Sequence, residues 1–221
     1  MKDDYSVKAI PAQETYEWIL KKHYAHRIPS ISYAFGLYEN NILAGICTFG
    51  STVSQTLNKG IAGEYYQNNI IELNRLCVES NEIDITSWFV SRCLRAFDNK
   101  IIVSFADTKQ GHVGKIYQAC NFIYTGLSAD RSRWALKGND VNHNHRAITQ
   151  KYTYAEIKEL YSDLMEYKKA SRKHRYLYMC GNKKFKREVM KALIYPICEY
   201  PKGETKRYDA SYKPITQGVL F

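Results

Sequence analysis

Seven short segments of the chain either alternate apolar and polar residues or run continuously apolar, as β-strands do. They lie at residues 5–10, 32–38, 42–50, 70–78, 101–107, 122–127 and 174–180. The segment at 101–107, IIVSFAD, does not alternate, which predicts a central strand covered on both faces. Glu39-Asn40-Asn41 separates the second and third segments and predicts a hairpin turn.

Helical spacing of apolar residues appears between these strands. It predicts helices at 11–27, within 79–97, and at 114–122, 153–169 and 182–194. Pro11 would open the first of these helices, and Asp84 or Thr86 would cap the second. The stretches at 50–68 and 127–150 are expected to be loop-like or irregular, and residues 200–214 a Tyr/Lys-rich coil.

This order of elements predicts an α/β fold, a mixed central sheet flanked by helices with a basic C-terminal extension. We expect a catalytic core at 1–126, an insertion with an amphipathic helix at 127–172, and a last core strand, basic helix and tail at 173–221, forming a single domain overall. A cleft is expected near the ends of the strands at 70–78 and 101–107.

Positive charge is concentrated near the C-terminus. The chain carries a net charge of +10, and residues 166–213 hold 14 Lys/Arg and five Asp/Glu, a net of +9. This asymmetry favours a polyanionic partner, and the alternative is a solvated basic face without a ligand. Lys and Arg neutralise phosphates and tyrosines stack on unpaired bases, so we expect DNA contacts from Arg172, Lys173, Arg175, Lys183, Lys184, Lys186 and Arg187.

Several classes of protein are disfavoured. The apolar runs are too short to span a bilayer, and the N-terminus carries acids where a signal peptide would be apolar. None of the six cysteines has CxxC spacing, which disfavours a zinc knuckle and favours core thiols in a reducing compartment. We therefore expect a cytoplasmic protein without membrane contact. GHVGK (111–115) lacks the spacing of a phosphate-binding Walker loop, which argues against a nucleoside triphosphatase.

The strand IIVSFAD followed by GKIYQACNFIYTG resembles the second half of a GNAT acyltransferase core. More of the chain, roughly residues 20–213, resembles the Mom family of phage DNA-modification proteins. The resemblance lies in KHYAHRIPSISYAFGLY, IIELNRLCV, SFADTKQGHVGKIYQACNFIYTGLS, RKHRYLYMCG and ALIYPICEYPKGETKRYD.

The resemblance to the Mom family implies a specific activity and partners. It implies conversion of adenine N6 in DNA to an acetamido (carbamoylmethyl) form, which shields phage DNA from host restriction. It also implies an acetyl-CoA-type donor, iron, and a double-stranded DNA substrate in the host cytoplasm. Because N6 is buried in the duplex, the adenine would have to be flipped out.

Asp107, Tyr117 and His112 are candidate catalytic residues around the expected cleft. Asp107 ends the central strand and is either a general base or metal ligand, or the cap of a helix that begins near Gly111. Tyr117 takes the tyrosine position of the acyltransferase family, which implies a proton donor to a thiolate leaving group, and the alternative is a core aromatic. His112 lies between two glycines and is either a ligand contact or a surface histidine.

His23 and His26 lie three residues apart, so one helical face would present both to a metal. With Asp107 they would form a two-His-one-carboxylate iron site, in which His23 is also a catalytic candidate. The alternative is that the helix ends at His23 and one histidine caps it. NHNH at 142–145 is a weaker candidate.

The candidate cofactor site comprises Arg75, Cys77 and Val78 on one strand, with Thr86 and Ser87 on the following helix. An inward arginine would hold a phosphate or carboxylate, whereas an outward one would form a surface salt bridge. GNAT acyltransferases cradle the CoA pyrophosphate in a glycine-containing turn here, but VESNEIDITSW has no glycine and three acids.

An acetamido product bonds nitrogen to the donor's methyl carbon, whereas ordinary acetyl transfer attacks the carbonyl carbon. Activation of a methyl C–H bond favours a redox metal, which leads to the hypothesis of iron-assisted chemistry on an acyltransferase scaffold. Two alternatives are a conventional N-acetyltransferase for a protein or small molecule and a non-catalytic DNA-binding module.

Overall fold

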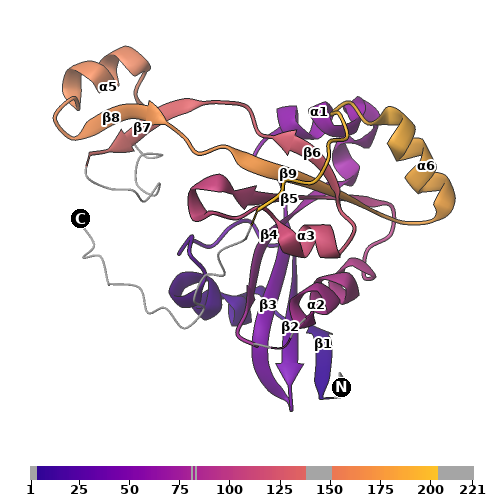
Figure 1. Cartoon of the computed structure of the whole chain (residues 1–221). Coiled ribbons are helices and arrows are strands. Elements are labelled where there is room, and N and C mark those ends of the chain that lie inside the picture. The colour runs from indigo at the N-terminus through magenta and orange to yellow at the C-terminus, as the bar shows by residue number, and fades with distance from the viewer. Residues whose placement is uncertain (1–3, 81, 83, 138–150, 204–221) are drawn as a thin grey trace.

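The computed structural model describes residues 4–80, 82, 84–137 and 151–203 (Figure 1). Its centre is a seven-stranded sheet in the order β1-β2-β3-β4-β5-β9-β6. Strands β4 and β5 pair in parallel and every other neighbouring pair in this sheet is antiparallel. The predicted mixed α/β sheet flanked by helices is therefore confirmed.

The strands of this sheet are β1 (Tyr5–Ala9), β2 (Tyr33–Glu39), β3 (Ile42–Gly50), β4 (Ile70–Val78), β5 (Lys100–Asp107), β6 (Ile123–Leu127) and β9 (Lys173–Cys180). The helices are α1 (Gln55–Tyr66), α2 (Ile85–Leu94), α3 (Lys115–Ala119), α5 (Tyr154–Leu160) and α6 (Lys183–Ala192), with short turns η1 (Ala12–Thr15), η2 (Trp18–Lys22), η3 (Gln67–Asn69) and η4 (Thr108–Gln110). Within the described ranges, no helix is long and apolar enough to cross a membrane.

The two faces of the sheet carry separate hydrophobic clusters. On one face, Phe89 and Cys93 of α2 pack with Phe122 and Tyr176 near α3. On the other, Val189 of α6 packs with residues beneath α1, including Ile61, Ile101 and Val103. Because Ile102 of β5 belongs to the first cluster and Ile101 and Val103 to the second, β5 is covered on both faces, as its continuous apolar pattern predicts.

The sheet opens between its two parallel strands. Strands β4 and β5 pair only from Ile70–Leu73 to Ile101–Ser104. Beyond Leu73 the pairing of β4 with β3 shifts register, so that Asn74 forms a bulge. A bulge bends its strand, and the C-terminal halves of β4 and β5 do not pair with each other. The two strands therefore separate near their C-terminal ends, where the sequence predicted a cleft.

A second, two-stranded sheet of β7 (Ser132–Leu136) and β8 (Met165–Lys169) projects from the main body between β6 and β9, with α5 beside it (Figure 1). The stretch at 127–150, expected to be irregular, thus contains the strand β7. Of the helix expected at 153–169, only the first part forms a helix, α5 (Tyr154–Leu160), and its last part forms the strand β8. Cross-strand pairing of Trp134 with Tyr167, whose rings lie 5.4 Å apart, favours strand over helix there.

Two other predictions of local structure are wrong. The expected loop at 50–68 forms α1, whose kink at Ala62 and Gly63 explains the glycine in its sequence. The helix expected at 11–27 is two short turns that end at Lys22, and His23 has extended backbone. Tertiary contacts hold the following residues against β4, which overrides the helical spacing.

Candidate functional site

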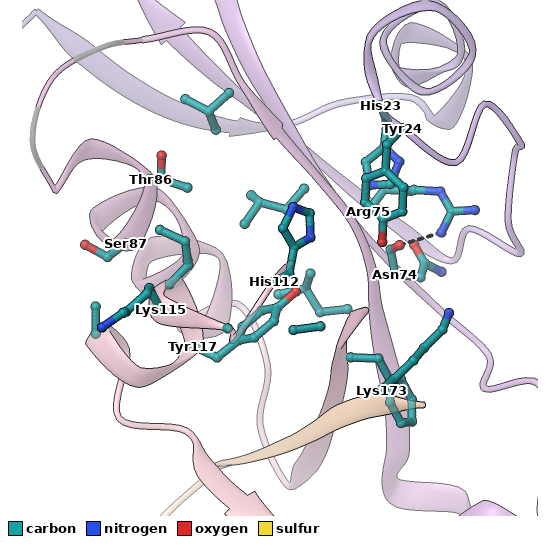
Figure 2. Close-up of a pocket in the computed structure, with 18 of the residues that line it drawn as sticks. His23, Tyr24, Asn74, Arg75, Thr86, Ser87, His112, Lys115, Tyr117 and Lys173 are labelled. Carbon is teal, nitrogen blue, oxygen red and sulfur yellow. Dashed lines mark hydrogen bonds between the residues drawn. The ribbon is translucent and has the colours of Figure 1, made fainter. Parts of the chain in front are cut away.

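A cavity of about 540 Å³ lies between the separated ends of β4 and β5. Figure 2 shows its walls: Thr86 and Ser87 of α2 with Lys115 and Tyr117 of α3 on one side, and His23, Tyr24, Asn74, Arg75 and Lys173 on the other, with His112 between them. Among the described residues, this cavity brings together the candidates His23, Arg75, Val78, Thr86, Ser87, His112, Tyr117 and Lys173.

The cavity reaches both faces of the sheet. Residues alternate sides along a strand, so Glu72 lies on the same face as Ile70, which belongs to the cluster beneath α1 and α6. Phe105 lines the cavity on that face too, because it packs on the same cluster. Arg175 of β9 stacks on Tyr195, which also packs on this cluster. Lys173 is two residues before Arg175 and therefore shares its face. Thr86, Ser87 and Tyr117 line it from the α2 and α3 side.

Tyr117 projects from α3 into the middle of the cavity. Its ring contacts Phe122 and Tyr176 at centroid distances of 5.4 Å and 5.3 Å. Burial raises the pKa of the Tyr117 phenol well above its usual value, and a hydrogen bond with Ser104 opposes that shift. The phenol therefore stays protonated near neutral pH. It is at once a core aromatic and a cavity residue.

The helix that carries Tyr117 is fixed by a close backbone approach. Gly114 has φ +77°, and a Cβ there would lie 2.4 Å from the Tyr176 ring. Gln118 donates to the Tyr176 hydroxyl at 3.1 Å, and this hydroxyl donates to the Val113 carbonyl. The GHVG sequence thus serves a tight turn and the placement of α3.

Asp107 lies at the edge of the cavity and does not line it. Its carboxylate accepts a hydrogen bond from the Lys109 amide at 2.9 Å and so caps η4, one turn before the helix start that the sequence indicated. Its other oxygen lies 3.7 Å from Nζ of Lys173. Lys173 itself lines the cavity, so Asp107 is linked to the cavity by this ion pair.

His112, Tyr24 and His23 form a chain of rings along one wall. The Tyr24 ring lies 5.5 Å from the His112 ring, edge to face, and 4.4 Å from the His23 ring, stacked. Burial, then the Asp107 charge, raises the pKa of Tyr24 to about 12. Burial, then the Arg75 charge, holds the pKa of His23 well below its usual value, so His23 is neutral at physiological pH.

The proposed iron ligands do not fit a metal site in this structure. The Nδ1 of His23 accepts a hydrogen bond from the Ala25 amide at 3.1 Å. The Nδ1 of His26 forms a hydrogen bond of 2.9 Å with the Leu20 carbonyl oxygen. His26 does not line the cavity, and Asp107 is engaged by Lys109 and Lys173. Among the described residues, no group of three His, Cys, Asp or Glu is placed to hold an ion. The NHNH candidate at 142–145 lies outside the described residues.

Arg75 lines the cavity and also clamps two segments of backbone together. Its Nε and Nη2 donate to the Arg27 carbonyl at 3.2 Å and 2.8 Å, and Nη1 donates to the Asn74 carbonyl at 2.6 Å, the dashed line in Figure 2. Burial lowers the pKa of this guanidinium. The contacts hold the segment with His23 and Tyr24 against β4.

Asn74 and Gly50 complete this clamp. The Asn74 side chain donates to the Ser30 carbonyl at 2.8 Å and accepts from the Thr48 hydroxyl at 2.6 Å. A Cβ on Gly50 would lie 1.9 Å from the same Ser30 oxygen, so only glycine allows the segment this close. The clamp could not be read from the sequence, because it joins side chains to carbonyls far along the chain.

The expected cofactor residues are only partly together. Val78, Thr86 and Ser87 line the cavity, whereas Cys77 is buried in a cluster with Trp18 and Ile46. Asp84 takes the N-cap position of α2 with a left-handed φ of 67° but does not cap it with its side chain. Both Asp84 and Glu82 line the cavity, and they oppose the helix dipole's attraction for an anion.

Glu72 is a cavity residue that was not among the candidates from the sequence. Burial raises the pKa of its carboxyl to about 7, with Lys173, Arg75 and Arg27 opposing that shift. The available signal was that Glu72 is the one acidic residue in the strand IIELNRLCV. A carboxyl poised near neutral pH in a cleft is typical of functional sites.

The cations expected to bind DNA fall into three groups. One group is exposed on α6 and comprises Lys183, Lys184, Lys186 and Arg187. Lys173 lines the cavity, and the exposed Arg172 just before it donates to the Ser128 carbonyl. Arg175 is buried: it donates to the Thr125 hydroxyl and carbonyl and lies 3.3 Å from the centre of the Tyr195 ring. We therefore remove Arg175 from the DNA-binding set.

Three kinds of similarity place the chain among known proteins. The methylcarbamoylase mom of Escherichia phage Mu is 26% identical over 115 residues, which is 49% of this chain and 48% of that protein, so the match spans about half of the relative's length. Two solved structures have a similar fold. An acetyltransferase of the GNAT family from Bacillus cereus is 10% identical, with 80% of this chain and 99% of the other covered and a TM-score of 0.43. An N-acetyltransferase from Staphylococcus aureus is 13% identical with the same coverage and a TM-score of 0.45. Structural similarity at such low sequence identity leaves the reaction and the substrate open. The Mom protein family, by contrast, matches residues 4–202, nearly the whole chain, and the protein therefore belongs to the Mom protein family.

Proposed function

We propose that this protein is a transferase that modifies adenine N6 in DNA to an acetamido (carbamoylmethyl) group. The observation that carries the proposal is the cavity between β4 and β5, which reaches both faces of the sheet and has Glu72 and Tyr117 along it. Such a cavity admits a donor from one face and an acceptor from the other. Membership in the Mom protein family and the name of the phage Mu relative, a methylcarbamoylase, support the choice of reaction.

The acceptor end is suited to a flipped base. Tyr24 and Phe105 supply ring surfaces there, Glu72 supplies a hydrogen-bonding group, and Lys173 supplies a positive charge near the entrance. Enzymes that modify a base in duplex DNA extrude it into such a pocket, at a cost of a few kcal/mol for unstacking. The exposed cations on the same face would hold the flanking phosphates.

The donor end would take an acyl-CoA-type molecule. The pairing of β4 with β5 ends at Leu73, and Val78 at the end of β4 lines the cavity, so a pantetheine-like chain would lie along this end of the strand. Lys115 is the cation on this side, and it opposes the unfavourable charges of Glu82 and Asp84 toward a pyrophosphate. Thr86 and Ser87 add hydroxyl groups and backbone amides at the start of α2.

Tyr117 would protonate the leaving group, and His112 would orient the reacting atoms from the opposite side. Asp107 would set the position of Lys173. Attack of N6 on a carbonyl carbon exchanges an N–H for an S–H bond without oxidation. Bonding N6 to the methyl carbon of an acetyl thioester also removes hydrogen from that carbon, a two-electron oxidation, so the identity of the product reports which chemistry occurs.

In an infected cell the modified adenines would shield phage DNA from restriction, and the protein would act in the host cytoplasm. The second candidate is a conventional N-acetyltransferase for a protein or small molecule, which the same two-ended cavity would serve. It leaves the exposed cations of α6 without a role.

Mass spectrometry of nucleosides from DNA of cells that express the protein tests the proposal. We expect an acetamido-adenosine adduct with wild-type protein and none with Tyr117→Phe. An N6-acetyl adduct would contradict the methyl-carbon chemistry. Unmodified DNA with turnover of acetyl-CoA would favour the conventional acetyltransferase, and DNA binding without either would favour a non-catalytic module.

A further inference from the structure

The carboxyl of Glu72 stands alone in the cavity. Glu72 pairs through its backbone with Gly50 of β3 and Val103 of β5, so its side chain is held in the centre of the sheet. Within the described part of the chain its carboxyl makes no hydrogen bond and no ion pair. A buried polar group without a partner costs free energy, so such a group in a cleft needs an explanation.

The cations near Glu72 are engaged elsewhere. Lys173 pairs with Asp107, and Arg75 donates to the carbonyls of Arg27 and Asn74. The charges of Lys173, Arg75 and Arg27 act on this carboxyl, and it acts in turn on the phenols of Tyr24 and Tyr117. The other titratable residues that line the cavity are His23, Glu82, Asp84, His112 and Lys115. None of them is placed to satisfy its oxygens directly, which leaves both oxygens for a ligand.

A neutral carboxylic acid matches the N1–N6 edge of adenine. Its carbonyl oxygen accepts a hydrogen bond from N6–H while its hydroxyl donates to N1. An ionised carboxylate loses this match, because both of its oxygens accept and would repel N1. We propose that Glu72 enters the reaction as a neutral acid, pairs with N1 and N6 of the extruded adenine, and shifts a proton from N6 to N1. This inference rests on the proposed function and names what recognises its acceptor.

The proton shift would make N6 nucleophilic. The lone pair of an adenine amino group is delocalised into the ring. When the Glu72 hydroxyl proton moves to N1 and an N6 proton moves to the other oxygen, one O–H and one N–H bond break and one of each forms, and the carboxyl ends neutral as it began. The imino nitrogen now holds a localised lone pair.

The transfer balances without an oxidant for one class of donor, a carbamoylmethyl compound whose methylene carbon already bears a leaving group. The methyl carbon of an acetyl thioester bears none and would need the two-electron oxidation. With such a carbamoylmethyl donor the N6–C bond forms as the bond from the methylene carbon to the leaving group breaks, and Tyr117 protonates the leaving group. The proton on N1 replaces the one lost by Tyr117, so overall one hydrogen moves from adenine to the leaving group. The pKa of about 7 keeps a large share of Glu72 neutral at physiological pH.

Two substitutions separate recognition from proton exchange. Glu72→Gln keeps one acceptor and one donor for the N6–N1 edge but has no proton to exchange. We expect it to bind an oligo(dA) strand within about threefold of wild type near pH 6 and to lose about 10²–10⁴-fold in modification rate. Glu72→Leu should weaken oligo(dA) binding by about 5- to 150-fold and leave oligo(dT) binding unchanged. Glu79→Gln, farther along the chain and paired with Lys22, is the control and should change neither.

The pH profile distinguishes this role from a merely structural one. Wild-type affinity for oligo(dA) should fall as pH rises above about 7, whereas Glu72→Gln should show no such fall because its carboxamide does not titrate in this range. Parallel profiles for the two proteins would overturn the inference. So would modification by Glu72→Gln at the wild-type rate in cells where the adenosine adduct forms, and that result would leave the proposed function intact.

A probe that needs no variant guards against misfolding. An oligonucleotide with 1-deazaadenine in place of adenine lacks N1 and should bind wild-type protein about 5- to 150-fold more weakly than oligo(dA). Equal binding of the two would refute the pairing. A pH-dependent preference for oligo(dA) without any adduct in cellular DNA would support the pairing while removing the proposed reaction.

Discussion

Glu72 links the cavity to the stability of the fold. Its carboxyl has a folded-state pKa of about 7 against an ordinary 4.5, so between these values the unfolded chain releases its proton first. The free energy of unfolding therefore falls as pH rises from about 4.5 to 7, because the unfolded state binds fewer protons, and this contribution is constant above 7.

Replacement of Glu72 by glutamine should remove that penalty. We expect Glu72→Gln to be more stable than wild type by roughly 2–3 kcal/mol near pH 8 and about equally stable near pH 4. Urea unfolding of both proteins at the two pH values measures the difference. A stability difference that does not change with pH would show that the carboxyl is not buried as described.

Tyr117→Phe tests the phenol as a proton donor. Loss of the hydroxyl should lower turnover by about 10²–10⁴-fold, since the ring contacts with Phe122 and Tyr176 remain and only the hydrogen bond with Ser104 is lost. The matched control is Tyr200→Phe, which removes a 2.6 Å hydrogen bond to the Phe122 carbonyl away from the cavity. The two variants should unfold at similar denaturant concentrations, and only the first should lose activity. An active Tyr117→Phe protein would end the assignment.

At the scale of elements, α3 depends on one glycine. Gly114→Ala would place a methyl group 2.4 Å from the Tyr176 ring at a φ of +77°. We expect a loss of about 2–4 kcal/mol of stability from strain and overpacking together, with reduced activity because Tyr117 moves with α3.

Gly126→Ala is the control. Its φ of +83° is similar, but its contact of 3.6 Å to Cys198 is ordinary, so strain alone should cost about 1–2 kcal/mol. Equal losses in thermal unfolding would contradict the steric argument.

The sheet could be predicted from the sequence because its signals are local. The continuous apolar run at 101–107 indicated the buried β5, and the alternation in IIELNRLCV separated Glu72 from Ile71 and Leu73 by face. The Asn40-Asn41 turn is confirmed, with φ values of 48° and 65° that suit a tight hairpin. These features depend on the period of the pattern within single elements.

The wall formed by His23 and Tyr24 could not be predicted, for a physical reason. Helical spacing at 11–27 indicated a helix that would present His23 and His26 together. In the structure Arg75 binds a carbonyl 48 residues earlier in the chain, and the segment leaves helical geometry at His23. Contacts between distant residues outweigh a local propensity of a few tenths of a kcal/mol per residue, and the helical face that would have presented His23 and His26 together is absent.

At the scale of the whole molecule, charge and cavity share one face. The cations of α6 and the cavity entrance at Lys173 both lie on the side of the sheet that carries α1 and α6. They stand at opposite ends of β9, eight residues or about 25 Å apart along the strand. If the proposed DNA substrate lies along this face, it would contact both.

This arrangement predicts how salt affects DNA binding. Each lysine or arginine that neutralises a phosphate contributes about −0.9 to the slope of log K against log salt, so wild type should show a steep slope. The double variant Lys184→Gln/Arg187→Gln on α6 should make the slope shallower by about 2, with equal effect on every DNA sequence.

The control is the double variant Arg92→Gln/Arg95→Gln. It removes two exposed cations from the end of α2, on the opposite face, and should leave the slope unchanged. Binding of a duplex measured across a range of salt concentrations decides the matter: equal slopes for the two double variants, or little salt dependence in wild type, would mean that DNA does not lie along the α6 face.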